Sequence, residues 1–158
     1  MIKDKETKDG TDNTVPVEIA KQMTAAFRKS QNAESGIYTK AAWYPAAQMT
    51  SLIKKMAELD GDGIRIYFGR YTSDIISQIN KLEYGDKIPD SYVDMNTVLL
   101  VITKNIDGKP GTDYFVEKGY AYKSHDGKLC DTPPTDPENR AELCPTQCDE
   151  KSPLSGPE

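Results

Sequence analysis

The spacing of apolar residues changes abruptly near residue 60, and this change constrains the fold more than any other feature. Before it, apolar residues recur every three or four positions, as on one face of a helix: Met49, Leu52, Ile53, Met56 and Leu59. After it, Ile64, Ile66 and Phe68 alternate with Arg65 and Tyr67, as in a half-buried strand. The pattern predicts a helix over 45–59, Gly61 as its C-terminal glycine, and a strand over 63–71 whose Ile64, Ile66 and Phe68 face the core.

The same reasoning predicts the remaining elements. One apolar stripe predicts a helix over 16–30, from Ile19, Met23, Ala26 and Phe27, and a second predicts a helix over 72–85, from Ile75, Ile79 and Leu82. The segment "NTVLLVIT" (96–103) is apolar on both faces, which indicates a central strand, and 113–122 suggests a third strand interrupted at Gly119. Helices and clustered strands predict an α+β fold: a small, mainly antiparallel sheet with two or three helices packed on one face, and polar extended tails.

The distribution of large apolar side chains predicts the domain boundaries. Residues 1–14 and 131–158 are nearly bare of them, whereas the middle of the chain is ordinary globular material. We expect a disordered N-terminal tail over 1–14, an α+β domain over 15–125 and a disordered tail over 150–158. The Pro- and Cys-rich segment 126–149 is expected to fold back on the domain.

Charge and hydrophobicity limit the classes of partner. Formal net charge is -5, from 20 basic and 25 acidic residues, with no basic run, which argues against a general nucleic-acid binder. The longest apolar run, 98–102, is far shorter than the roughly 20 residues of a membrane span. The N-terminus lacks the apolar stretch of a secretory signal, and the cysteine count of 3 is odd. The sequence therefore predicts a cytoplasmic protein without a membrane span.

Sulfur and imidazole are concentrated near the C-terminus. The chain's one histidine and all its cysteines are His125, Cys130, Cys144 and Cys148. Four such ligands are the set that a closed tetrahedral zinc site needs, so structural zinc is one hypothesis. A second is a disulfide, most easily between Cys130 and one of the other two cysteines, and a third is free thiols beside a solvent-facing histidine. The spacing does not fit a C-x-x-C redox motif.

The predicted strand 63–71 carries a second candidate site. If Ile64, Ile66 and Phe68 face the core, Arg65, Tyr67 and Tyr71 share the opposite face, and Arg70 follows Gly69. Two guanidinium groups and two phenols suit an anion or a peptide, although an ordinary solvated sheet face has the same composition. Trp43 is a further candidate for a partner surface, unless it packs the helix that follows it onto the sheet.

The sequence contains few residue patterns that are typical of an enzyme. With a single histidine, the remaining enzyme hypothesis is a thiol-dependent one, in which Cys144 or Cys148 acts with His125. No phosphate-binding glycine loop is present, and "DGDG" (60–63) lacks the acidic ligands of a calcium loop, so it reads as a turn.

Several segments together resemble a family of small bacterial proteins of unknown function: "MTAAFRKS", "WYPAAQMTSLIKKM", "DGIRIYFGRY", "NTVLLVIT" and "ELCPTQCD". The resemblance covers about residues 15–149. It implies no catalytic residue, and it implies that the cysteine-containing end belongs to the domain. The residues favour a non-enzymatic binding or assembly module, with a protein partner or self-association through an edge strand.

Overall fold

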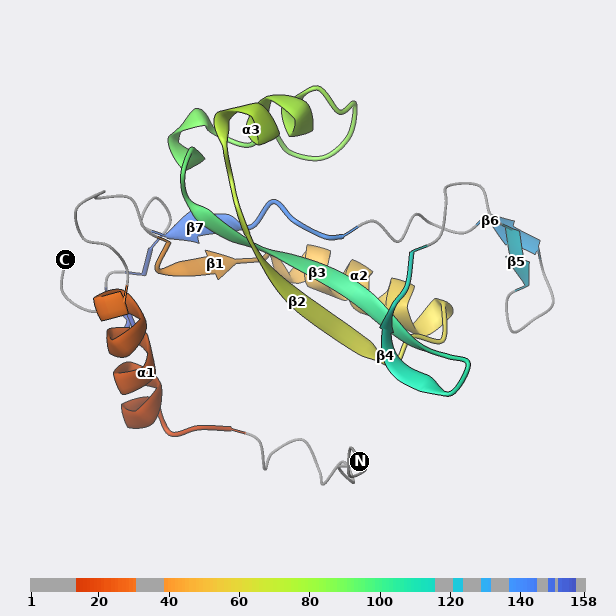
Figure 1. Cartoon of the computed structure of the whole chain (residues 1–158), viewed down its shortest axis with the longest axis horizontal. Coiled ribbons are helices and arrows are strands. Elements are labelled where there is room, and N and C mark those ends of the chain that lie inside the picture. Colours follow the sequence, from red (N-terminus) through yellow and green to blue (C-terminus); the bar gives the residue numbers. More distant parts are fainter. Residues whose placement is uncertain are drawn as a thin grey trace. The chain divides into compact units, whose positions relative to one another are not determined.

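The chain divides into two compact units. The computed structural model describes residues 14–30, 39–115, 121–123, 129–131, 137–144, 148–149 and 151–155 (Figure 1). One unit comprises Met1–Gly36 with Cys148–Glu158, and the other comprises Ile37–Gln147. The helix that the sequence assigned to the start of the α+β domain therefore belongs to the first unit. Most of the two predicted tails lies outside the described residues.

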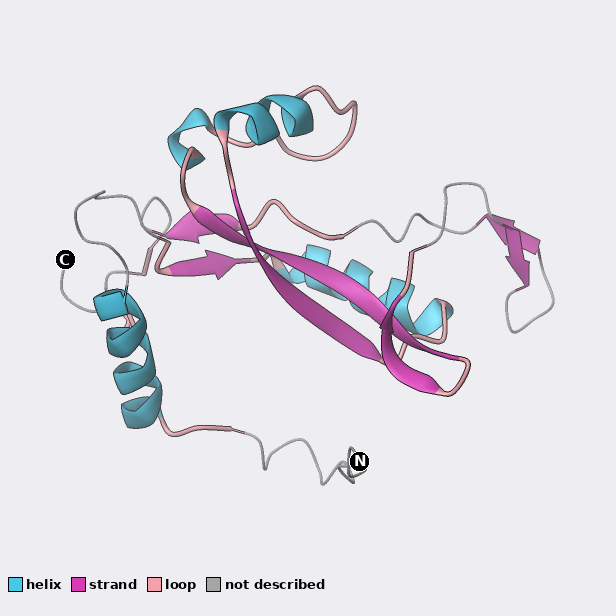
Figure 2. Ribbon diagram, viewed as in Figure 1, coloured by secondary structure: helices cyan, strands magenta, loops and turns pink. Residues whose placement is uncertain are grey.

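The described elements are three α-helices, a short 3-10 helix and seven strands (Figure 2). In chain order they are α1 (Val17–Ser30), β1 (Ala41–Trp43), α2 (Ala46–Glu58), β2 (Gly63–Arg70), α3 (Ser73–Asn80), η2 (Asp90–Tyr92), β3 (Asn96–Ile106), β4 (Lys109–Asp113), β5 (Ala121–Lys123), β6 (Leu129–Asp131) and β7 (Glu142–Cys144). The sheets are β2–β3–β4, β1–β7 and β5–β6, and every pair is antiparallel. The predicted α+β fold class is confirmed.

The predicted helices form, with one correction at the end of α2. The Thr72 hydroxyl accepts a hydrogen bond from the Ile75 amide at 3.2 Å and so caps α3. Beyond α2, Asp60 adopts the left-handed conformation (φ 54) that the sequence assigned to Gly61. Gly61 is required for another reason: a Cβ there would lie 2.6 Å from Cγ of Met56 and 3.1 Å from Cγ2 of Ile102. None of the helices within the described residues has the length and apolar character to cross a membrane.

The third strand of the main sheet is not where the sequence placed it. β3 extends to Ile106, Asp107 (φ 51) and Gly108 (φ 78) make a tight turn, and β4 returns along β3. An Asp-Gly pair readily adopts this two-residue turn, because both positions tolerate positive φ. The last two residues of the predicted third strand belong instead to β5 (Ala121–Lys123), which pairs with β6, and residues 116–120 lie outside the described part of the chain.

The core of the larger unit consists of two apolar clusters. One joins α2 to the sheet and contains Leu52, Leu59, Leu100 and Ile102, with Ile64 packed against them. The other lies around α3, η2 and β7, and contains Tyr71, Ile76, Ile88, Tyr92, Met95, Ala141 and Leu143. Tyr44 packs against both clusters. The segment 137–144 is therefore an integral part of this core.

β2 is less buried than the sequence predicts. Ile64, Ile66 and Phe68 do share the face of the sheet that α2 covers, since they lie opposite Ile102, Leu100 and Val98 of β3. Only Ile64 packs against the α2 cluster, whereas Ile66 is 57% exposed and Phe68 is 89% exposed. The prediction that these two side chains are in the core is wrong, because α2 covers only the part of β2 near Ile64.

Candidate functional site

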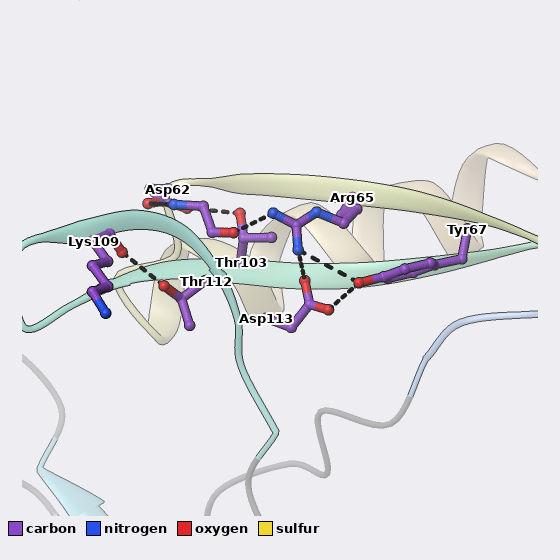
Figure 3. Close-up of polar contacts among 8 residues, drawn as sticks. Asp62, Arg65, Tyr67, Thr103, Lys109, Thr112 and Asp113 are labelled. Carbon is purple, nitrogen blue, oxygen red and sulfur yellow. Dashed lines mark hydrogen bonds and ion pairs between the residues drawn. The ribbon is translucent and has the colours of Figure 1, made fainter. Parts of the chain in front are cut away.

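A polar cluster spans the solvent-facing side of the main sheet (Figure 3). Nη1 of Arg65 lies 2.7 Å from Oδ1 of Asp113 and donates to the Tyr67 hydroxyl at 3.4 Å. The Tyr67 hydroxyl donates to the other carboxylate oxygen of Asp113, and Nη2 of Arg65 donates to the carbonyl of Gly111. Arg65 is on β2 and Asp113 is on β4, so these bonds cross over β3 and brace the sheet.

Asp62 extends this cluster at the start of β2. Its carboxylate accepts one hydrogen bond from the Thr103 hydroxyl and one from the Gly111 amide, each at 2.7 Å. The Thr103 bond first, and then the Gly111 bond, lower the pKa of Asp62, because both donors favour the charged carboxylate. The Tyr67 hydrogen bond and the Asp113 charge raise the pKa of Arg65. Both shifts favour the charged forms of Asp62 and Arg65.

The side chains of Arg65 and Tyr67, which the sequence predicted to bind a ligand, already bind other groups of this chain. Arg65 and Tyr67 do share one face, as predicted, but Asp113 and Gly111 of the same chain already accept bonds from the guanidinium. Arg70 lies at the other end of β2 and pairs with Asp94 at 3.3 Å. Both cations of the strand are therefore neutralised by carboxylates of this chain.

Tyr71 does not belong to this face, and its assignment to the face is corrected. β2 ends at Arg70, and Tyr71 lies in the core at 1% exposure, with its ring stacked on Tyr92. Its hydroxyl donates to Oδ1 of Asn139, and Nδ2 of Asn139 donates to the Val98 carbonyl at 2.8 Å. Burial raises the pKa of Tyr71. Tyr71 is withdrawn from the exposed surface because it packs with the cluster around α3, η2 and β7.

The opposite face and the outer edge of β2 form a second candidate surface. On β3, Leu100 exchanges main-chain bonds with Glu138, the Ile102 carbonyl accepts from the Tyr114 amide, and the Val98 carbonyl accepts from Asn139. These β3 groups point away from β2, so Ile66, Ile64 and Phe68, which lie opposite them, form the non-hydrogen-bonded pairs of the ladder.

The main-chain N–H and C=O groups of these three β2 residues consequently point to the outer edge of the sheet. β2 is the last strand on that side, and within the described chain no other strand pairs with it there. We call this edge, together with the exposed side chains of Ile66 and Phe68, the β2 edge surface.

Trp43 is also exposed, at 55%, in β1, opposite Glu142 of β7. The next residue in the chain, Tyr44, packs into the core, and burial raises the pKa of Tyr44 to about 12. A partner surface at Trp43 stays a prediction.

The cysteine-containing end is organised by a disulfide. Cys144, at the end of β7 and buried, is bonded to Cys148, whereas the disulfide hypothesis had placed the bond most easily between Cys130 and one of these two. Cys130 lies in β6, and His125 lies outside the described residues. Among the described residues, no group of three or more metal-ligating side chains converges.

The zinc hypothesis with His125, Cys130, Cys144 and Cys148 stays a prediction. Cys144 and Cys148 would serve as thiolate ligands, or as enzymatic nucleophiles, only after reduction. Metal analysis of protein purified under reducing conditions tests the zinc set: it requires about one zinc ion per chain, and a substoichiometric content contradicts it.

Sequence reasoning missed the residues that complete these sites. Asp113, Gly111 and Asn139 contact the β2–β3 pair from positions 40 or more residues along the chain from their partners. An Asp-Gly hairpin read at 107–108 would have returned the next strand along β3, but in regular register it would have set Thr112 opposite Thr103. The register shift between Lys104 and Ile106 brings Asp113 to that position instead. Asn139 carried no local signal.

Comparisons with protein-family models, with characterised proteins and with solved structures gave no match for this chain. The resemblance to a bacterial family is not tested by them, and the assignment of a function therefore depends on the geometry above.

Proposed function

We propose that the chain is a binding or assembly module that takes up an extended peptide segment at the β2 edge surface. The observation that supports this proposal is the exposure of Phe68, whose side chain is 89% exposed. It lies on β2, whose outer main-chain groups have no partner strand in the described chain. Exposed apolar groups are unfavourable in water, and main-chain groups at a sheet edge are ready to pair.

Strand addition would use both features of the surface. An added strand exchanges main-chain hydrogen bonds with Ile64, Ile66 and Phe68, and these bonds supply affinity that depends little on sequence. Side chains of the added strand alternate between its faces, so every second one would contact Ile66 or Phe68. Specificity would then come from apolar residues at alternate positions of the partner segment.

The polar cluster on the other face supports this function indirectly. Its bonds from Arg65 to Asp113 and Gly111 tie β2 to β4 across β3, so the strand that receives the segment is braced. An anionic ligand at Arg65 would have to displace Asp113 from a 2.7 Å ion pair. Within the described residues, no observation favours that alternative over strand addition.

A displayed library of short peptides with alternating apolar residues tests the proposal. Selected peptides should slow amide exchange at Ile64, Ile66 and Phe68, because these N–H groups point to the added strand. Phe68→Asp should weaken the binding by about tenfold or more. Ile75→Asp is the matched control, since Ile75 is an exposed apolar residue of α3 and not of β2. Selected peptides that leave these three amides unprotected would contradict strand addition.

A further inference from the structure

We infer that the segment that pairs with β2 is β2 of a second copy of this chain, running antiparallel with its two-fold axis at Tyr67. This inference rests on the proposed strand addition and specifies its partner. It follows from three properties of the strand: which residues offer outward main-chain groups, which side chains are exposed, and how its charges are neutralised.

The outward main-chain groups limit the registers of such a pair. They belong to Ile64, Ile66 and Phe68, so the hydrogen-bonded pairs between two copies must join these even-numbered positions. An axis at Tyr67 places Ile66 of each copy opposite Phe68 of the other, twice over. β-branched residues opposite aromatic residues are among the favourable cross-strand pairs. This register covers both exposed apolar side chains of the edge.

Neighbouring registers lack this match. An axis at Ile66 would set Phe68 opposite Ile64, which is already packed against the α2 cluster. An axis at Phe68 would set Ile66 opposite Arg70, so the exposed Ile66 would lose its aromatic partner. In the register centred on Tyr67, the residue opposite Arg70 is Ile64, which already packs against the α2 cluster. With the axis at Tyr67, the two Tyr67 rings face each other across the axis, and Arg65 lies opposite Gly69, which has no side chain.

Charge also permits two copies of this strand to meet. β2 carries two cations and no anion, and a pair of such strands would repel if the cations were free. Asp113 neutralises Arg65 at 2.7 Å, and Asp94 neutralises Arg70 at 3.3 Å. In the register centred on Tyr67 no arginine lies opposite another arginine, so the edge is compatible with its own copy.

The area available predicts the strength of the pair. An aromatic side chain buries about 150–250 Å², so Ile66 and Phe68 together offer on the order of 300 Å² per copy. Stable interfaces bury about 1,200–2,000 Å² in total. The dimer should therefore be weak and reversible, with a dissociation constant in the range of about 10 µM to 1 mM. It should also be closed, because a two-fold axis uses the same edge of both copies.

Sedimentation of the full chain from about 10 µM to about 1 mM, followed by amide exchange over the same range, tests the inference. A monomer–dimer equilibrium should appear, and exchange at Ile66 and Phe68 should slow as concentration rises. Phe68→Asp should weaken the dimer about tenfold or more, and Ile75→Asp should leave it unchanged. Urea denaturation of both variants checks that they are folded.

Three results would overturn the inference. One is a monomer throughout the range, and another is a dimer that Phe68→Asp does not weaken. The third is protection of Ile66 and Phe68 that does not depend on concentration, because the chain would then cover its own edge. If the protein is a monomer but its β2 edge binds the library peptides, only the pairing of two copies is contradicted. If the protein is a monomer and binds none of the peptides, strand addition is contradicted as well.

Discussion

At the scale of single residues, two tyrosines only four positions apart have opposite environments. Tyr67 is exposed and its hydroxyl donates to Asp113, whereas Tyr71 is buried and its hydroxyl donates to Asn139. The difference arises because Tyr71 packs into the cluster around α3, η2 and β7, to which Tyr67 does not belong. A buried acceptor that loses its donor lowers the stability of the fold, whereas an exposed acceptor can accept a hydrogen bond from water instead.

Tyr71→Phe should therefore lower the free energy of unfolding by about 1–3 kcal/mol, because Oδ1 of Asn139 would lose its donor in the core. Tyr67→Phe is the matched control, and it should change the free energy of unfolding by less than about 0.5 kcal/mol. Urea denaturation of both variants measures the difference. Equal effects of the two substitutions would contradict the burial argument.

The pKa of Asp62 makes part of the stability depend on pH. Its folded-state pKa lies below the ordinary carboxyl value, chiefly through the Thr103 hydrogen bond. The ionised carboxylate therefore stabilises the fold above about pH 4, and this contribution is lost as pH falls through the lowered folded-state pKa.

Asp62→Asn should reduce the melting temperature at neutral pH, and the deficit should shrink on acidification below about pH 4. Asp60→Asn is the control, because Asp60 is exposed and asparagine also tolerates its positive φ. Thermal unfolding followed from pH 7 to pH 3 gives the comparison. A deficit that stays constant over this range would show that the charge of Asp62 does not matter.

At the scale of elements, the end of α2 shows how tightly the helix is seated on the sheet. Gly61 passes close to Met56 of the helix and Ile102 of β3, and its amide donates to the Met56 carbonyl at 2.8 Å. There is no space for a side chain at this position. The helix therefore docks at one place, which also explains why it leaves Ile66 and Phe68 uncovered.

Gly61→Ala should lower the free energy of unfolding by about 1–3 kcal/mol, the usual cost of overpacking a core. Gly63→Ala should cost clearly less, since a Cβ there would meet only Thr103 Oγ1, at 3.2 Å. Denaturation in urea compares the two. If Gly61→Ala were as stable as the wild type, the close approach of α2 to β3 would be refuted.

The disulfide at the end of β7 is a short covalent loop. Closing a loop of this length is worth about 2 kcal/mol or less in the free energy of unfolding. Cys148→Ser should therefore destabilise the oxidised protein by up to that amount, and the loss should vanish when both proteins are compared under reducing conditions. Equal stabilities under oxidising conditions would mean that the bond does not form in solution.

At the scale of the whole molecule, the larger unit contains both core clusters, whose members all lie between residues 42 and 143. α1 contributes no buried residue. β7 and Asn139, close to the end of that unit, supply Leu143 and the bonds that hold Tyr71 and β3. The larger unit should thus fold alone, but only with its C-terminal segment.

A fragment of residues 37–149 should unfold cooperatively, with a free energy of unfolding within about 1 kcal/mol of that of the full chain. A fragment of residues 37–136 should fail to fold, because it lacks Ala141, Leu143 and Asn139. Circular dichroism during thermal unfolding distinguishes the two. A stable 37–136 fragment would show that β7 is dispensable.

The sequence by itself determined the type and approximate position of most elements. Helical spacing from Met49 to Leu59 and alternation from Ile64 to Phe68 are local properties, because each depends only on the repeat of its own backbone. The α+β class follows from their order along the chain. Local patterns also showed correctly that Arg65 and Tyr67 share a face.

Only the tertiary structure decided which of these residues are covered and which are paired. Phe68 has the pattern of a core residue, yet its exposure depends on where α2 ends and docks. Arg65 finds Asp113, 48 residues later, only because an Asp-Gly hairpin returns β4 along β3. The burial of Tyr71 depends likewise on contacts between distant segments, which local patterns do not encode. Cys144 and Cys148 are close in sequence, but the pattern did not determine whether they bond to each other, to Cys130 or to a metal.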